Sequence, residues 1–220
     1  MNSIRAGKRA EERMCADVNN IYCVGRNYRQ HAEELGNKVP VEPLIFLKPS
    51  HAAVPLDKAV IQLPKDAGLI HYEGEIVLRI ARDYVPGMSV QELVDVMALG
   101  LDFTLRDVHN DLQKKGLPWT PAKGFKNAAP LTPYIAFPET EELEATDFTV
   151  RKNGVEVQRG NVKNMIFSLQ NIVDFIASRY GLGKDDIIYT GTPAGVGPVV
   201  SGDSFELYWG DTLLGTCLIG

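Results

Sequence analysis

Three acidic residues lie in or beside apolar stretches of this chain, where a charge is costly unless it is paired. Glu73 and Glu75 open the segment HYEGEIVLRI, and Asp102 interrupts the apolar run from Val96 to Leu105. Side chains two positions apart in a strand point to the same face, so the two glutamates are expected side by side. Adjacent carboxylates raise each other's pKa unless a cation lies between them. Three carboxylates without a matching Cys or His are typical oxygen ligands of a hard divalent cation such as Mg²⁺ or Mn²⁺.

These acids also have ordinary structural interpretations. A Glu-x-Glu pair at the start of a strand is typical of a solvated sheet edge, and Asp102 can pair with Arg106 four residues later. Spacing alone leaves both the metal site and the ordinary interpretation open.

A second pattern lies in the segment CVGRNYRQHAEE, which leaves a predicted strand through Gly25 and enters a predicted helix. His31 and Glu34 are three residues apart and share a helix face. A carboxylate beside an imidazole raises its basicity and fixes its tautomer, which prepares a general base. The alternative is a chance pair on a surface helix, and Glu33 competes with Glu34 as the partner.

Positive charge follows the third acid. Arg106 and His109 are three residues apart, and Lys123 lies in the turn-like segment PAKGF. An arginine suits a planar carboxylate by paired hydrogen bonds, and a lysine near a bound metal stabilises an oxyanion or an enolate. Ordinary surface charge is the alternative for each of them.

The glycine-rich loop YTGTPAGVGP has no Gly-Lys-Ser/Thr and no amphipathic helix after it, so nucleotide binding is not expected. Its glycines let the backbone approach a ligand closely. Free N–H groups and the Thr192 hydroxyl are candidates to hold a small anion. A plain tight turn is the alternative.

Strands are the main elements that must position these side chains. Short apolar or alternating runs that end at Pro, Gly or a charge predict them, and Asn153-Gly154 predicts a hairpin with a type I′ turn. The predicted strands are Ile21–Gly25, Leu44–Lys48, Val60–Leu63, Glu73–Ala81, Phe148–Arg151, Val155–Arg159, Ile187–Tyr189, Ser204–Trp209 and Thr212–Ile219.

Helices are fewer. The segment Ser168–Tyr180 has the apolar spacing of an amphipathic helix and begins at a serine cap. Shorter helices are predicted at Asn27–Leu35, Ser89–Val96 and Asp107–Lys115. The fold class is therefore α+β and β-rich, without the alternation of a doubly wound sheet.

Composition limits the class of protein. The chain has 220 residues, 45% of them hydrophobic, which is enough for one core without a disulfide or zinc staple. Its formal net charge of −5 and its lack of a basic block argue against nucleic acid, and no apolar run has membrane-span length. Three cysteines without ligand or redox spacing indicate a reducing compartment. We expect a charged arm over residues 1–18 and one domain over residues 19–220.

The sequence resembles the fumarylacetoacetate hydrolase family, most closely its short single-domain acylpyruvase and oxaloacetate decarboxylase branch. The resemblance extends from about Ile21 to the C-terminus. It is carried by VGRNYRQHAEELG, PLIFLKPSHA, HYEGEIVLRI, LGLDFTLRDVHNDLQKKGLPWTPAKGF and IIYTGTPAGVGPV.

This resemblance implies a role for each candidate residue. It implies a twisted mixed-β fold of the family's C-terminal-domain type, a homodimer and Mg²⁺ or Mn²⁺, for which Ca²⁺ can substitute. The cysteine pattern and its reducing compartment separately favour a cytoplasmic location. His109 stands where close members often carry Gln, which bears on substrate preference. The implied metal ligands are Glu73, Glu75 and Asp102, the implied catalytic residues are His31 and Glu34 on a lid together with Lys123, and the implied substrate contacts are Arg26, Arg106, His109, Gly191 and Thr192.

The implied activity is metal-dependent hydrolysis of C–C bonds in acylpyruvates, which are 2,4-dioxo acids such as acetylpyruvate and fumarylpyruvate. Decarboxylation of oxaloacetate is a related expectation, because both reactions pass through a pyruvate enolate. One alternative is an isomerase or decarboxylase of the 2-hydroxyhepta-2,4-diene-1,7-dioate type. Another is a β-rich binding module without catalysis.

Overall fold

The computed structural model describes Cys15, residues 17–30 and residues 39–220. Its largest sheet has eight strands in the order β2-β1-β13-β6-β7-β9-β3, with β10 beside β7. Most pairs are antiparallel, but β1 with β13 and β3 with β9 are parallel, so the sheet is mixed. Its strands are β1 (Ile21–Gly25), β2 (Leu44–Lys48), β3 (Ala53–Pro55), β6 (Gly74–Ile80), β7 (Val94–Leu101), β9 (Ala129–Leu131), β10 (Ile135–Ala136) and β13 (Ile187–Tyr189).

Two smaller sheets complete the fold. A five-stranded sheet has the order β12-β11-β15-β16-β4, and a three-stranded sheet has the order β14-β5-β8. These strands are β4 (Ala59–Ile61), β5 (Ile70–Tyr72), β8 (Thr104–Leu105), β11 (Phe148–Lys152), β12 (Val155–Gly160), β14 (Gly197–Pro198), β15 (Ser204–Trp209) and β16 (Thr212–Ile219).

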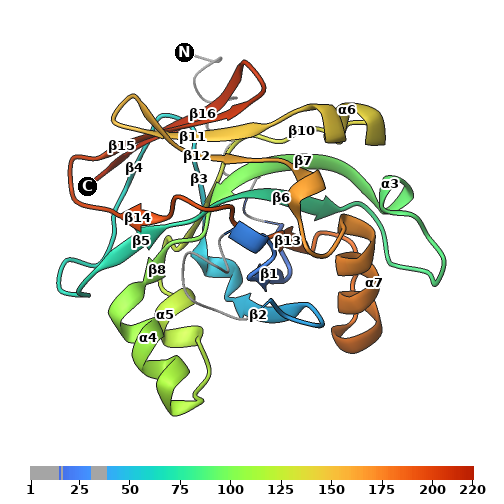
Figure 1. The fold of residues 1–220 in the computed structure, drawn as a ribbon, viewed down its shortest axis with the longest axis horizontal. Helices are drawn as coiled ribbons and strands as arrows, with labels where there is room; N and C mark the ends of the chain where they lie inside the picture. Colours follow the sequence, from blue (N-terminus) through green and yellow to red (C-terminus); the bar gives the residue numbers. More distant parts are fainter. Residues whose placement is uncertain (1–14, 16, 31–38) are drawn as a thin grey trace.

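The larger hydrophobic cluster includes residues of both the five-stranded and the eight-stranded sheet, which are stacked at the top and centre of Figure 1, and a second cluster comes mainly from the eight-stranded sheet. Strand β15 shows the pattern that produces this packing: Phe205, Leu207 and Trp209 are buried, whereas the residues between them are partly exposed. Alternation of this kind is what a strand with one buried face requires. The β-rich α+β class and its mixed twisted sheets are thus confirmed.

Short helices cover the sheets and the strand ends. The predicted helix at Ser168 is confirmed as α7, and the Ser168 hydroxyl accepts the backbone N–H of Asn171 at its N-terminus, at 3.2 Å. In Figure 1, α4 and α5 lie together below β8, on the opposite side of the molecule from α7. The helices are α3 (Val90–Leu93), α4 (Arg106–Lys115), α5 (Thr120–Lys123), α6 (Thr140–Ala145), α7 (Leu169–Tyr180) and the 3₁₀ helices η1 (Ser50–Ala52) and η2 (Val162–Asn164).

One predicted helix is too long. Ser89 does cap a helix, but α3 ends at Leu93 and the chain continues as β7 from Val94. Pairing of β7 with β6, which starts at Val94 opposite Ile80, overrides the local helical pattern. The helix predicted over Asn27–Leu35 extends beyond the described residues.

The hairpin is confirmed. Asn153 and Gly154 both have positive φ, at 53° and 78°, as a type I′ turn requires.

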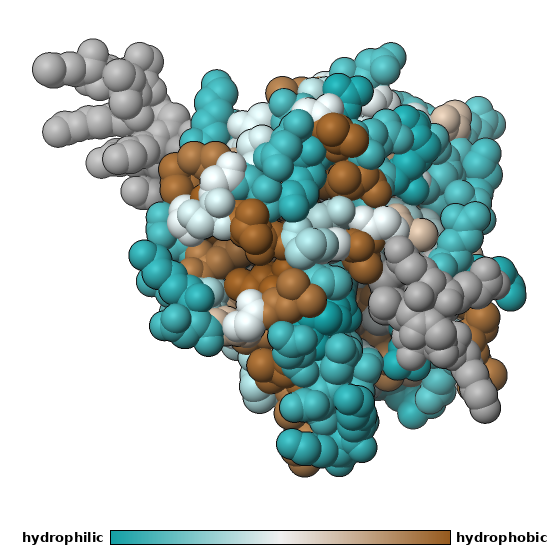
Figure 2. Space-filling view, turned by 60° about the vertical axis from the view of Figure 1, so that its left-hand side comes forward, coloured by the Kyte–Doolittle hydropathy of each residue, from teal (hydrophilic) through white to brown (hydrophobic). Residues whose placement is uncertain are grey.

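An apolar surface area is visible on one side of the molecule. Figure 2 turns the left-hand side of Figure 1 forward and shows brown residues gathered there among hydrophilic ones. The elements on that side include β4, β5, β14 and β16, and exposed apolar residues in or beside these strands are Val60, Leu69, Val200 and Leu218. Large apolar patches mark surfaces that another molecule covers. The homodimer stays a prediction.

None of the helices in the described part of the chain is long and apolar enough to cross a membrane.

Candidate active site

The three predicted acids meet at one end of the β6–β7 pair. Gly74 is opposite Leu101 in this antiparallel pair, so the residue before β6 and the residue after β7 are neighbours. The Asp102 N–H donates to the Glu73 carbonyl at 2.7 Å. The predicted strand at Glu73 begins one residue later, at Gly74, yet both glutamates reach the same place. One ligand oxygen from each of Glu73, Glu75 and Asp102 lies within 4.8 Å of the others, and all three residues are buried.

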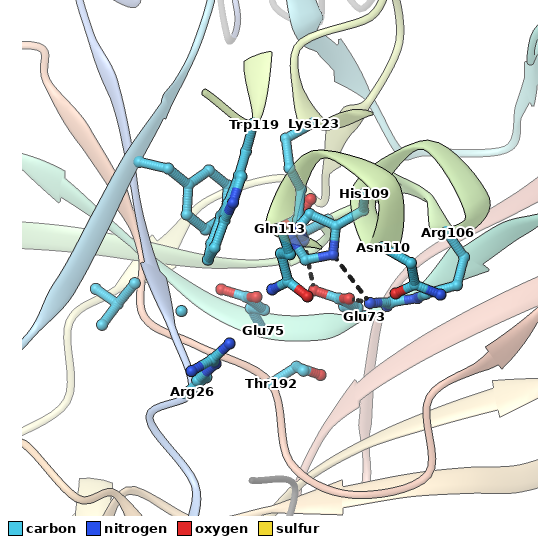
Figure 3. A pocket seen from close by; sticks show the side chains of 14 residues that line it. Arg26, Glu73, Glu75, Arg106, His109, Asn110, Gln113, Trp119, Lys123 and Thr192 are labelled. Atoms are coloured by element: carbon cyan, nitrogen blue, oxygen red, sulfur yellow. Dashed lines mark hydrogen bonds and ion pairs between the residues drawn. The ribbon is translucent and has the colours of Figure 1, made fainter. Parts of the chain in front are cut away.

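A pocket of about 650 Å³, including its space open to solvent, exposes these carboxylates. Its walls come from β1, β2, α4, α5 and the loop after β13. Figure 3 shows Arg26 and Thr192 on one side of the acids and His109, Asn110 and Gln113 of α4 on the other. The lining residues are Val24, Gly25, Arg26, Phe46, Glu73, Glu75, Asp102, Arg106, His109, Asn110, Gln113, Trp119, Lys123 and Thr192.

Lys123 lies between two of the acids. Its Nζ donates to Glu73 Oε2 and to Asp102 Oδ2, both at 2.7 Å. Burial alone would lower the pKa of Lys123, but Asp102 and Glu73 outweigh it and raise that pKa above its usual value. The other oxygen of Glu73 accepts a hydrogen bond from the Arg106 guanidinium. Two buried positive charges therefore border the acids in the pocket.

Glu75 is in a different position from its two neighbours. Its Oε2 accepts the N–H of Gly191 at 2.7 Å, and among the described residues it forms no ion pair. Burial, and then the charges of Asp102 and Glu73, raise its pKa well above the usual range. A third buried carboxyl without a cation of its own is what a divalent cation would compensate, so the donor set fits a metal.

His109 lines the pocket with a neutral imidazole. Its Nδ1 lies 3.4 Å from the Arg106 guanidinium, which can only donate, so Nδ1 accepts and Nε2 carries the proton. Burial, together with Lys123 and Arg106, lowers the pKa of His109 to about 3. The ring packs edge-on against Trp119, with centroids 4.6 Å apart, and its Nε2 has no partner among the described residues.

Hydrogen bonds connect the glycine-rich loop to the segment of Glu73 and Glu75. The Thr192 hydroxyl donates to the Gly74 carbonyl at 2.9 Å and accepts from Gln158 Nε2 at 2.8 Å. Gln158 Oε1 in turn accepts the Gly74 N–H at 2.8 Å. Gly191 has a φ of +102°, and a Cβ there would lie 2.6 Å from the Cβ of Asn27, so only glycine suits this turn.

The roles predicted for two catalytic residues stay predictions. His31 and Glu34 lie outside the described residues. Arg26, which was predicted to contact the substrate, does line the pocket. Its backbone has a positive φ of 59°, and partial burial lowers the pKa of its guanidinium.

Several site residues were missed by the sequence prediction. Asn110 and Gln113 follow Arg106 at helical spacings of four and seven, a signal that could have placed all three on one face of α4. Phe46, Trp119, Gln158 and Lys48 come from distant segments and carried no such signal.

Comparison with known proteins supports the resemblance. Residues 20–217 match the model of the fumarylacetoacetate (FAA) hydrolase C-terminal family. The chain belongs to this family. It is 36% identical over 189 residues to the mitochondrial oxaloacetate tautomerase FAHD1 of Mus musculus, covering 85% of each chain. It is 35% identical over 193 residues to oxaloacetate tautomerase YcgM of Escherichia coli (strain K12), covering 86% of this chain and 88% of that one.

Solved structures of family members share the fold. Fumarylpyruvate hydrolase from Pseudomonas aeruginosa, in complex with Mn²⁺ and pyruvate, superposes with a TM-score of 0.82 at 31% identity and covers 92% of this chain and 89% of that one. A fumarylacetoacetate isomerase/hydrolase structure from Oleispira antarctica superposes with a TM-score of 0.85 at 39% identity. The match covers 92% of this chain and 94% of that one. The chain is thus a family enzyme with a buried acidic triad that can hold a divalent metal.

Proposed function

We propose that this enzyme forms and consumes enolates of small 2-oxo acids with the help of a divalent metal, and that oxaloacetate is a substrate for tautomerisation and decarboxylation. The observation that carries the proposal is the meeting of three buried carboxylates with Lys123 and Arg106 at the base of one pocket. The sequence similarity to two oxaloacetate tautomerases supports this choice of substrate.

Glu73, Glu75 and Asp102 are the residues that would hold Mg²⁺ or Mn²⁺. When bound, the cation supplies Lewis acidity toward a 2-oxo oxygen. Oxygen ligands alone suit such hard cations, and the uncompensated carboxyl of Glu75 is the site's own evidence of fit.

The chain's cations then act on the substrate oxygens. Lys123 provides a fixed ammonium where negative charge grows on the 2-oxo oxygen as the enolate forms. Arg106 holds a substrate carboxylate by paired hydrogen bonds. The Nε2–H of His109 donates to a further acceptor oxygen without adding charge.

The two oxaloacetate reactions differ in their need for a base. Tautomerisation moves a proton from C3 to the 2-oxo oxygen, and we assign its removal to His31 oriented by Glu34. Decarboxylation breaks the bond between C3 and the C4 carboxylate, carbon dioxide leaves, and the electron pair forms the C2–C3 double bond of the pyruvate enolate, whose negative charge lies on the 2-oxo oxygen until C3 takes a proton. It therefore needs no base at carbon.

Hydrolysis of acylpyruvates is a second candidate, favoured by the structural similarity to fumarylpyruvate hydrolase. This reaction needs an activated water as well as the same enolate. His109 is a poor base for it, because its pKa is lowered to about 3. The activating base would again be His31, an effect of roughly 10²–10⁴-fold.

A side-by-side assay tests the proposal. Oxaloacetate tautomerisation, oxaloacetate decarboxylation, acetylpyruvate hydrolysis and fumarylpyruvate hydrolysis are measured with Mg²⁺, with Mn²⁺ and with EDTA. We expect metal-dependent turnover of oxaloacetate. Turnover of only 2-hydroxyhepta-2,4-diene-1,7-dioate would favour the isomerase. No turnover, with no rise in melting temperature on adding Mn²⁺ or oxalate, would favour a binding module.

A further inference from the structure

Lys48 is a fully buried lysine directly behind the acidic site. It is the last residue of β2, its side chain has no exposed area, and it does not line the pocket. Its ammonium therefore touches the site from the protein interior and not from the side that a substrate reaches.

The Lys48 ammonium contacts three carbonyls and one carboxylate. Its Nζ donates to the carbonyls of Phe103 at 3.2 Å, Ala128 at 3.1 Å and Lys123. These three acceptors match the three N–H groups of an ammonium. The Nζ also lies 2.7 Å from Asp102 Oδ1, in an ion pair that lacks the alignment of a hydrogen bond.

These partners belong to the segments that carry the site. Phe103 follows Asp102 directly, and the carbonyl of Lys123 belongs to the residue whose own ammonium bridges Asp102 and Glu73. The backbones also approach closely here, since a Cβ on Gly124 would lie 2.8 Å from the Pro49 ring that follows Lys48. The Lys48 ammonium thus binds the backbone next to Asp102 and the backbone of Lys123. These are the two residues joined by the 2.7 Å contact between Lys123 Nζ and Asp102 Oδ2.

We propose that Lys48 is a positioning residue for the acidic site, which holds Asp102 and the backbone of Lys123 in the arrangement that receives a divalent cation. This rests on the metal site of the proposed function. Groups behind the ligands of metal sites commonly act this way, and their loss costs about 10–100-fold in metal affinity.

Charge alone predicts the opposite effect, which makes the inference testable. Removing a positive charge next to Asp102 should strengthen the attraction of a divalent cation to the three carboxylates. Weaker metal binding after loss of Lys48 would therefore not follow from direct charge attraction and would support a positioning role.

The experiment measures Mn²⁺ binding by titration calorimetry in the wild type and in Lys48→Met, which keeps the length of the side chain and removes the ammonium. The matched control is Lys152→Met, which removes another lysine that pairs with a buried acid, Asp203, at 2.8 Å and does not line the pocket. We expect the dissociation constant to rise tenfold or more in Lys48→Met and to stay within twofold in Lys152→Met. An unchanged or lower dissociation constant in folded Lys48→Met would overturn the inference.

Lys48→Arg keeps the test decisive if Lys48→Met does not fold. It retains the charge and several donors with a different geometry, so we expect weaker Mn²⁺ binding than in the wild type. Wild-type affinity in Lys48→Arg together with a lower melting temperature would show a purely stabilising role and contradict positioning. Failure of the wild type to bind Mn²⁺ would contradict the proposed metal site itself, and this inference with it.

Discussion

Replacing Glu75 with glutamine separates the stability of the metal-free protein from its ability to bind metal. Burial and the charges of Asp102 and Glu73 raise the pKa of Glu75 well above 4.5, its ordinary value. A carboxyl with a raised pKa contributes stability below its unfolded pKa and loses it as the pH rises toward the folded pKa. The neutral amide of Glu75→Gln has no such loss, and its oxygen can still accept the Gly191 N–H.

The size of this stability difference follows from the number of protons that Glu75 binds in the folded and in the unfolded protein. While Glu75 stays protonated in the fold and ionises in the unfolded chain, each pH unit above 4.5 costs the wild type about 1.4 kcal/mol. Between pH 5 and pH 7 the variant should therefore gain stability relative to the wild type, by at most about 2.7 kcal/mol. Repulsion of two unit charges over 4.8 Å, roughly 3.5 kcal/mol at an effective dielectric constant near 20, is of the same order.

Urea unfolding at pH 5, 6 and 7 in EDTA measures this difference, and Mn²⁺ should then reverse it. Binding to the folded state at a concentration 100 times the dissociation constant adds about 2.7 kcal/mol, and only the wild type retains all three carboxylates. Glu206→Gln, on β15 outside the pocket, is the matched control. Equal pH slopes for wild type and Glu75→Gln in EDTA, or equal stabilisation of both by Mn²⁺, would refute the reasoning.

Three further changes test separate parts of the site. His31→Ala should abolish acylpyruvate hydrolysis yet leave much of the oxaloacetate decarboxylation, and a parallel fall of both at unchanged metal affinity would contradict that division. Gly74→Ala places a Cβ 2.4 Å from the Val150 side chain and should cost about 1–3 kcal/mol in urea unfolding. If the clash is the cause, Val150→Ala should cost less in that background than in the wild type. His109→Leu should raise the KM for oxaloacetate roughly tenfold, as loss of one hydrogen bond predicts, whereas His109→Gln should retain a donor and most of the affinity.

Local patterns predicted most of the framework. The predicted strands at Ile21–Gly25, Leu44–Lys48 and Ser204–Trp209 have the observed bounds, because alternation and turn residues act over a few positions. The helix predicted over Ser89–Val96 was too long, because β7 pairs with β6 from Val94 onward and this long-range pairing ends α3 at Leu93. Period-two spacing also predicted that Glu73 and Glu75 lie together, although the strand itself begins between them.

The support of the site could not be predicted in the same way. Lys48 lies more than fifty residues from Asp102 in sequence, and Gln158 on β12 reaches Gly74 across two sheets. Neither contact leaves a periodic or spacing signal, because each depends on which strand ends meet in space. The carboxylates were visible in the sequence as charges in apolar runs, whereas the groups that orient them were not.

Enolate formation is the step common to tautomerisation, decarboxylation and hydrolysis, so it is the most direct test of the proposed chemistry. The measurement is the exchange of the methyl protons of pyruvate with deuterium oxide, followed by proton NMR with Mg²⁺ present. We predict that the wild type speeds this exchange and that EDTA or Lys123→Met abolishes the acceleration, while a folded Lys152→Met variant keeps it. No acceleration by the wild type, or the same acceleration in EDTA and in folded Lys123→Met, would contradict a metal-assisted enolate site at Glu73, Glu75 and Asp102.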